Sequence, residues 1–437
     1  MKEFYAPELE ARGMSIPEAG RKEILFVNAR KALERLAPID GPLGAWFVPG
    51  RVEFLGKHTD YAGGRSLVCA IERGICALAR PRTDGVVRIV EAAAGSRAEF
   101  DIRPDLPVPE GSWATYPATV LRRVCRDFPA VVRGFDIAFA SDLPQAAGLS
   151  SSSALVVAVY LALVEVNRLR PFPSDEEVAG YLGAVENGRA FGLLPAHLGV
   201  GTHGGSQDQT AILCSQPGQL AQFSWDPVRL ERWIKLPDGY RLAIAVSGVV
   251  AEKTGKARDA YNAASGAASE LLRRWRLGTG RDDATLAAAM SSGPGARAHL
   301  ESLLADSEAL RARLEQFVVE SFHLILEAGN ALERGDLAAL GPLVDRSQAA
   351  AERGLGNQRA ETIHLARSGR QLGAVAASAF GAGFGGSVWA LVEEERLEEF
   401  LVQWARDYRA AFPELERRSE FFTTGAGPAA CRLMGLG

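Results

Sequence analysis

A serine-rich turn, placed directly before a long apolar run, is the feature that most constrains how this chain can fold. Residues 143–154 read LPQAAGLSSSSA, and apolar residues continue to position 164. The run is longer than a typical strand and rich in helix formers, so the serines are expected at the start of a helix. Free backbone N–H groups, the positive end of the helix dipole and the hydroxyls meet there, which predicts an anion site for phosphates. A simple helix cap would need one serine rather than four.

Length and composition indicate a soluble enzyme. The chain has 437 residues and is expected to form two or three domains. Its net charge is −4, whereas a nucleic-acid-binding protein usually has an excess of basic residues. The N-terminus has no apolar signal-peptide core, and no uninterrupted apolar run is long enough to cross a membrane. The five cysteines form no CxxC pair and are expected to be buried thiols. We therefore expect a cytoplasmic protein without nucleic-acid or membrane partners, at most weakly homo-oligomeric.

Two further glycine-rich segments lie far from the serine turn. Residues 50–64 place Arg, Lys, His, Asp and Tyr between glycines. This composition is typical of a site for a polar ligand and unlike that of a solvated loop. A salt-bridged turn is the structural alternative for this segment. Residues 380–387 precede an expected strand, so they do not fit the strand–glycines–helix order of a dinucleotide fingerprint. Two loops from different domains are expected to close over one ligand.

A shift in composition near residues 225–238 is the best candidate for a domain boundary. It divides the chain into an N-terminal domain of residues 1–235 and a C-terminal domain of residues 236–437. Residues 173–191 are expected to be helical, with Ser174 as the cap.

The three segments, in this order and at this spacing, resemble those of the GHMP kinases. Residues 50–64, GRVEFLGKHTDYAGG, are similar to the signature that marks galactokinases within that superfamily, and residues 205–209 resemble the segment that carries its catalytic aspartate. This resemblance covers nearly the whole chain. It implies an α+β architecture of two domains: an N-terminal domain like ribosomal protein S5 and a ferredoxin-like C-terminal domain.

The resemblance also implies a site for ATP and Mg²⁺. The phosphates would lie over the serine turn, the adenine beside two aromatic side chains, and the second glycine loop would close over the nucleotide. Mg²⁺ would be held by Ser151 or Ser152 together with Glu186. No Walker string occurs in the chain. The residues implied for the nucleotide are Trp113, Tyr116, Gly148, Leu149, Ser150, Ser151, Ser152, Gly383 and Gly385.

A sugar 1-kinase activity follows from the same resemblance. Asp208 would orient or deprotonate the anomeric hydroxyl, and Arg51 would neutralise the charge that builds on the transferring phosphoryl group. Without the resemblance, Asp208 could equally belong to a turn before an apolar strand at residues 210–214. The residues implied for sugar binding are Arg51, Lys57, His58, Asp60, Gly205, Asp208 and Tyr261.

Three departures from the galactokinase pattern leave the sugar open. Lys57 stands where galactokinases carry a glutamate that helps to hold the hexose. If it lies near C6 of the sugar, a hexuronic acid becomes a candidate beside galactose, whereas a neighbouring acid such as Glu53 or Asp60 could neutralise it and leave galactose as substrate. Residues 263–265 replace paired arginines of the family, and residues 191–204 form a longer loop.

Two other functions remain as alternatives at this point. One is a GHMP kinase for a non-sugar alcohol such as mevalonate or homoserine, which the acidic string around Asp60 disfavours. The other is a catalytically silent sugar or ATP sensor, which the intact set of Arg51, Asp208 and Glu186 disfavours.

Overall fold

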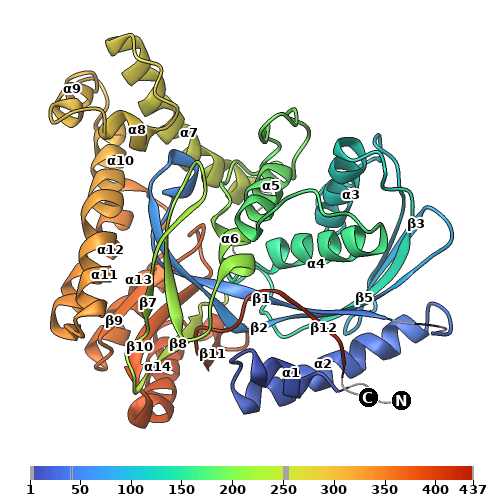
Figure 1. Ribbon diagram of the computed structural model, residues 1–437. Helices are drawn as coiled ribbons and strands as arrows, with labels where there is room; N and C mark the ends of the chain where they lie inside the picture. Colours follow the sequence, from blue (N-terminus) through green and yellow to red (C-terminus); the bar gives the residue numbers. More distant parts are fainter. Residues whose placement is uncertain (1–3, 40, 42, 250–254, 436–437) are drawn as a thin grey trace.

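The computed structural model describes residues 4–39, 41, 43–249 and 255–435 (Figure 1). Within these residues, the strands form one eight-stranded and one four-stranded sheet. The larger sheet has the order β12-β1-β2-β5-β3-β4, with β6 paired to β2 and β7 to β6. Its pairs are antiparallel except for β3 and β5. The strands are β1 Gly44–Leu55, β2 Arg65–Pro81, β3 Val86–Glu91, β4 Arg97–Asp101, β5 Phe135–Ser141, β6 Gln219–Ser224, β7 Arg229–Lys235 and β12 Cys431–Leu433.

Helices cover both faces of the larger sheet, which explains why β1 is buried along its whole length. An N-terminal pair of helices packs below the sheet in Figure 1 and four helices pack above it. Strands covered on both faces lose the alternation of polar and apolar residues, so β1 and β2 consist mainly of buried residues. The helices are α1 Ala6–Ala11 and α2 Ile16–Glu34 below, and α3 Thr115–Asp127, α4 Ser151–Val166, α5 Asp175–Asn187 and α6 Gln207–Cys214 above.

The smaller sheet is antiparallel and has the order β11-β8-β10-β9. Aromatic residues of α14, among them Trp404 and Tyr408, join alanines of β8 and β9 in one apolar cluster on its face. The strands are β8 Tyr240–Val246, β9 Ala376–Phe380, β10 Ser387–Glu393 and β11 Glu420–Thr424, and the helices beside them are α12 Leu337–Gly354, α13 Ala360–Gln371 and α14 Leu397–Ala411.

A helical arm connects β8 to the rest of the second half and lies beside the loop that follows β1 (Figure 1). One turn of this arm, η2 at Glu320–Leu324, is a π-helix. The remaining elements are η1 Asp60–Ala62, α7 Gly255–Thr279, α8 Leu286–Met290, α9 Ala296–Ser302, α10 Glu308–Val319, α11 Ile325–Glu333, η3 Glu394–Arg396 and η4 Pro413–Leu415.

This architecture confirms the α+β class expected from the sequence, with one local error. Residues 210–214, considered as a strand, are the second half of helix α6. The division of the chain at residue 235 stays a prediction: it falls between β7 in the larger sheet and β8 in the smaller one, while β12 returns to the larger sheet. Among the described residues, no helix combines the length and apolar character needed to span a bilayer.

Candidate active site

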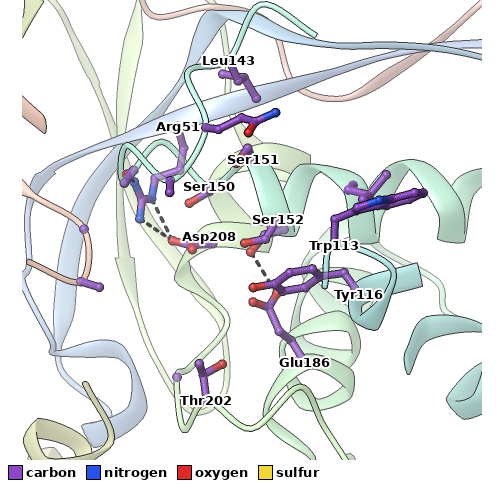
Figure 2. A pocket seen from close by; sticks show the side chains of 18 of the residues that line it. Arg51, Trp113, Tyr116, Leu143, Ser150, Ser151, Ser152, Glu186, Thr202 and Asp208 are labelled. Atoms are coloured by element: carbon purple, nitrogen blue, oxygen red, sulfur yellow. Dashed lines mark hydrogen bonds and ion pairs between the residues drawn. The ribbon is translucent and has the colours of Figure 1, made fainter. Parts of the chain in front are cut away.

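A cavity of about 700 Å³ lies where β1, the serine turn, α5 and α6 meet the loop that follows β9. Its wall combines segments from positions 51 to 382 of the chain, and Figure 2 shows the polar side chains that face it. All three glycine-rich segments contribute to the lining. The three segments, which lie far apart in the sequence, therefore meet at one cavity.

The serine turn starts helix α4, as its sequence predicts. Gly148 has φ +75° and Ser150, the N-cap residue, has φ +62°, so the chain turns sharply before Ser151 begins the helix. The hydroxyl-bearing residues 150–153 all line the cavity. Leu149 has a different place: its side chain packs in the apolar core and is not among the described lining residues, so it can offer a ligand only its backbone.

The second glycine loop reaches the cavity through Gly381 and Ala382. Gly383 and Gly385, expected to contact the nucleotide, are not among the described lining residues. A Cβ on Gly383 would lie 2.5 Å from atoms of Asn357, and one on Gly385 would lie 2.7 Å from the Val249 carbonyl oxygen. These two glycines let the loop pack against its own half of the molecule.

Asp208 and Arg51 form an ion pair at the edge of the serine turn. Nε and Nη2 of Arg51 lie 2.8 and 2.7 Å from Oδ1 of Asp208, and Nη1 donates to the carbonyl oxygen of Gly148 at 2.5 Å. The Arg51 side chain is 4% exposed and that of Asp208 is 18% exposed, so the carboxylate is the partner that faces the cavity more openly. Arg51 thus connects the acid to the turn that begins α4.

His58, Asp60, Gly205 and Tyr261, which the resemblance implies for sugar binding, line the cavity near Asp208. Burial lowers the pKa of His58 to about 4, so its imidazole is neutral at pH 7. Its Nε2 lies 3.0 Å from the Ala382 carbonyl oxygen. Because a carbonyl oxygen only accepts, this hydrogen bond requires that the imidazole proton is on Nε2. Burial, followed by the nearby charge of Asp208, raises the pKa of Asp60.

Lys57, which the resemblance implies as a sugar-binding residue, directs its side chain away from the cavity. Lys57 is 1% exposed, and its Nζ donates to Ser378 Oγ at 2.8 Å. Lys57 is not among the described residues that line the cavity. The direction of the Lys57 side chain follows from the backbone, which turns at Gly56 with φ +113° and at His58 with φ +57°. This turn brings His58 to the cavity and directs Lys57 away from it.

Glu53, which was expected only as a possible partner of Lys57, is a cavity residue. It follows Arg51 by two positions on β1, and alternation along a strand puts both on one face. Its Oε2 accepts from Gln207 Nε2 at 2.6 Å, while its Oε1 is buried without a partner among the described residues. Burial, only partly offset by the charges of Arg51 and Lys57, raises the pKa of Glu53 to about 7.

Glu186 lies at the cavity end of α5 in a fixed orientation. Its Oε2 accepts from Ser153 Oγ at 2.9 Å and from Gln209 Nε2 at 2.6 Å. Neither donor was predicted; Gln209 follows Asp208 on α6, and spacing alone gives no reason to connect it with α5.

At the end of the cavity opposite Arg51, Trp113 and Tyr116 provide the aromatic surface that was expected for adenine.

Family models match three stretches of the chain. They are the galactokinase galactose-binding signature at residues 39–81, the GHMP kinases N terminal domain at residues 115–216 and the GHMP kinases C terminal domain at residues 330–410. A Lactococcus lactis galactokinase, solved in complex with galactose, has the same fold: the TM-score is 0.80 at 23% identity, covering 93% of this chain and 99% of that one.

Curated relatives extend the similarity along the sequence. The galactokinase of Roseiflexus sp. (strain RS-1) is 30% identical over 364 residues, which cover 83% of this chain and 87% of that protein. The galactokinase of Bacillus subtilis (strain 168) is 26% identical over 396 residues, covering 89% and 94%. These matches confirm the resemblance inferred from the three loops. The chain therefore belongs to the galactokinase family of the GHMP kinases and is an ATP-dependent sugar 1-kinase.

Proposed function

We propose that this kinase transfers the γ-phosphoryl group of ATP to the anomeric hydroxyl of a neutral hexose, with galactose as the first candidate. The observation that carries the choice of a neutral sugar is the orientation of Lys57, whose ammonium group bonds Ser378 instead of facing the cavity. Near Asp208 the lining instead offers the acidic residues Glu53 and Asp60. Carboxyl groups form hydrogen bonds with sugar hydroxyls whether or not they are ionised, and neither residue offers the cation that would pair with the carboxylate of a hexuronic acid.

In this mechanism Asp208 accepts the hydrogen bond of the anomeric hydroxyl and takes up its proton as the oxygen attacks the γ-phosphorus. The new bond joins the sugar oxygen to phosphorus, and the bond between the γ-phosphorus and the bridging oxygen breaks to release ADP. Arg51, already held against Asp208 and the Gly148 carbonyl, places positive charge beside the transferring group. Such charge stabilises the transition state of phosphoryl transfer.

The nucleotide would place its phosphates at the start of α4 and its base beside Trp113 and Tyr116. The first turn of α4 supplies free N–H groups and serine hydroxyls to an anion. The residues fit a Mg²⁺ ion as well: Glu186 is held in place by two hydrogen bonds, and Ser151 or Ser152 can add a hydroxyl. Mg²⁺ favours one or two carboxylates together with phosphate oxygens, and when bound it neutralises phosphate charge.

A panel of acceptors tests the proposal. ADP release is measured with galactose, galacturonate, arabinose, mevalonate and homoserine at saturating Mg-ATP. We expect kcat/KM for galactose to exceed that for galacturonate by about tenfold or more, which corresponds to about 1.4 kcal/mol. Mevalonate and homoserine should give no turnover above the sugar-free rate. Equal or better turnover of galacturonate would contradict the proposal that the substrate is a neutral hexose. ATP binding without turnover of any acceptor would favour a catalytically silent sensor.

A further inference from the structure

The Lys57 side chain belongs to a buried series of hydrogen bonds. This series connects the sugar-signature loop (residues 56–65) to the second half of the molecule. Lys57 Nζ donates to Ser378 Oγ on β9, and Ser378 Oγ in turn donates to Gln348 Oε1 on α12 at 3.1 Å. The amide of Ala379 donates to the same Gln348 oxygen at 3.1 Å. All four residues are buried. Removing an ammonium group from water costs free energy, so its burial at this position calls for a structural explanation.

The backbone of the same loop is held by one face of α10 and the turn after it. The Gly56 amide donates to Glu320 Oε1 at 2.8 Å, Gln316 Nε2 donates to the Lys57 carbonyl at 3.2 Å, and Arg313 Nη2 donates to the His58 carbonyl at 2.7 Å. Positions 313, 316 and 320 are spaced three and four residues apart and share one side of the helix. Successive side chains of this face therefore bind successive backbone groups of the loop, in the opposite chain direction.

The π-turn η2 extends this contact to the other end of the loop. Arg65 Nη1 donates to the Ser321 carbonyl at 3.3 Å. A Cβ on Gly64 would collide with Ser321 Oγ and lie 3.0 Å from Phe317 Cε2, so a larger residue would force these side chains to shift. Single π-turns inside helices occur frequently at functional sites, and this one places Glu320 and Ser321 against opposite ends of one loop.

Between these fixed ends the loop presents His58, Asp60 and Tyr61 to the cavity. The residues that hold it are not among the described lining residues, so they can act on a ligand only through the loop. We propose that Lys57, Arg313, Gln316 and Glu320 form a buried clamp that positions the sugar-signature loop, and that Lys57 sets the affinity for the sugar without selecting among sugars. The functional part of this inference rests on the proposed function, because it takes the loop to be the sugar contact.

Lys57→Met is the informative change, since methionine occupies a similar volume without the charge. The hydrogen-bond partner of the Lys57 ammonium group, Ser378, is neutral, so the change removes the desolvation cost of a buried charge without breaking an ion pair to that partner. The loop nevertheless loses its bond to Ser378. We expect the KM for the preferred sugar to rise about tenfold, while kcat, the KM for ATP and the ranking of sugars stay within about threefold of the parent. Gln316→Met should raise the KM in the same way by removing the bond to the Lys57 carbonyl.

A double-mutant cycle with Ser378→Ala separates positioning from general damage. If Lys57 acts through Ser378, the combined variant should have a KM close to that of the more impaired single variant, so the effects are not additive. Lys22→Met is the matched control, because Lys22 is also fully buried and bonds Glu18 and Asp142, neither of which is among the described lining residues. It should lower the melting temperature and leave the KM unchanged. Fully additive effects, or a raised KM in the control, would overturn the proposal.

Hydrogen exchange of the peptide that contains residues 56–65 gives a readout that does not depend on turnover. The clamp predicts faster exchange of this peptide in Lys57→Met and Gln316→Met, without faster exchange in α4 or α5. Unchanged exchange would show that no clamp exists. Faster exchange together with a changed order of sugars, for example in Lys57→Glu, would make Lys57 a specificity residue and contradict the proposal. If the parent phosphorylates no sugar at all, the proposed function fails while the exchange data still decide the clamp.

Discussion

Asp208→Asn is expected to lower kcat by roughly 10²–10⁴-fold while the affinity for Mg-ATP changes by less than about threefold. Asparagine has nearly the same shape as aspartate but cannot accept the proton of the attacking hydroxyl. The change also removes the charge that pairs with Arg51, whose Nε lies 2.8 Å from Asp208 Oδ1. Single-turnover rates with the preferred sugar and calorimetric titration with ATP measure the two quantities separately.

Asp136→Asn is the control for this substitution. Asp136 is buried and binds three arginines at the other end of the larger sheet, so its loss tests what removing a buried acid does to the fold. We expect a lower melting temperature and an unchanged kcat. A kcat within about threefold of the parent in Asp208→Asn would mean that another group handles the proton, and would remove Asp208 from the mechanism.

Gly148→Val is expected to abolish measurable Mg-ATP binding in a protein that still folds. Gly148 has φ +75°, a conformation that β-branched residues resist, and its carbonyl accepts the bond from Arg51 Nη1. A Cβ there would lie 3.6 Å from the Phe380 carbonyl oxygen and 3.8 Å from the Gly386 Cα. The methyl groups of valine would therefore enter the narrow space between the serine turn and the glycine loop. Calorimetry with Mg-ATP measures the loss.

Gly239→Val separates this effect from backbone strain. Gly239 has φ +76° in a turn where an added Cβ would have no atom within 4 Å, so valine there carries the same strain without filling a site. It should reduce stability and bind ATP as the parent does, and circular dichroism confirms that both variants fold. Unchanged ATP affinity in a folded Gly148→Val protein would place the nucleotide elsewhere.

The features that could be predicted from the sequence have local causes. Four serines before an apolar run specify the start of α4, and Ser174 caps α5 by accepting from the Glu177 amide. The resemblance to a family then connected loops such as residues 50–64 and Asp208 that the sequence alone could not bring together. The class of the fold and the sugar kinase activity followed from that connection.

Other features depend on packing between distant segments, which no local pattern encodes. The direction of Lys57 follows from positive φ at Gly56 and His58 together with a partner, Ser378, that lies 321 positions away. Gly383 could not be distinguished from Gly381 until Asn357 was seen beside it. Residues 210–214 are apolar on a short helix, where periodicity cannot separate a helix from a strand.

The most direct test of a sugar 1-kinase compares galactose with methyl α-galactoside, in which the anomeric hydroxyl is blocked. Both are incubated with Mg-ATP and the parent enzyme, and phosphorus NMR identifies the product. The account predicts that galactose gives ADP and a sugar phosphate whose phosphorus couples to the anomeric proton, and that the methyl galactoside gives none. Phosphorylation of the methyl galactoside, or a product phosphate on any other carbon of galactose, would contradict the account.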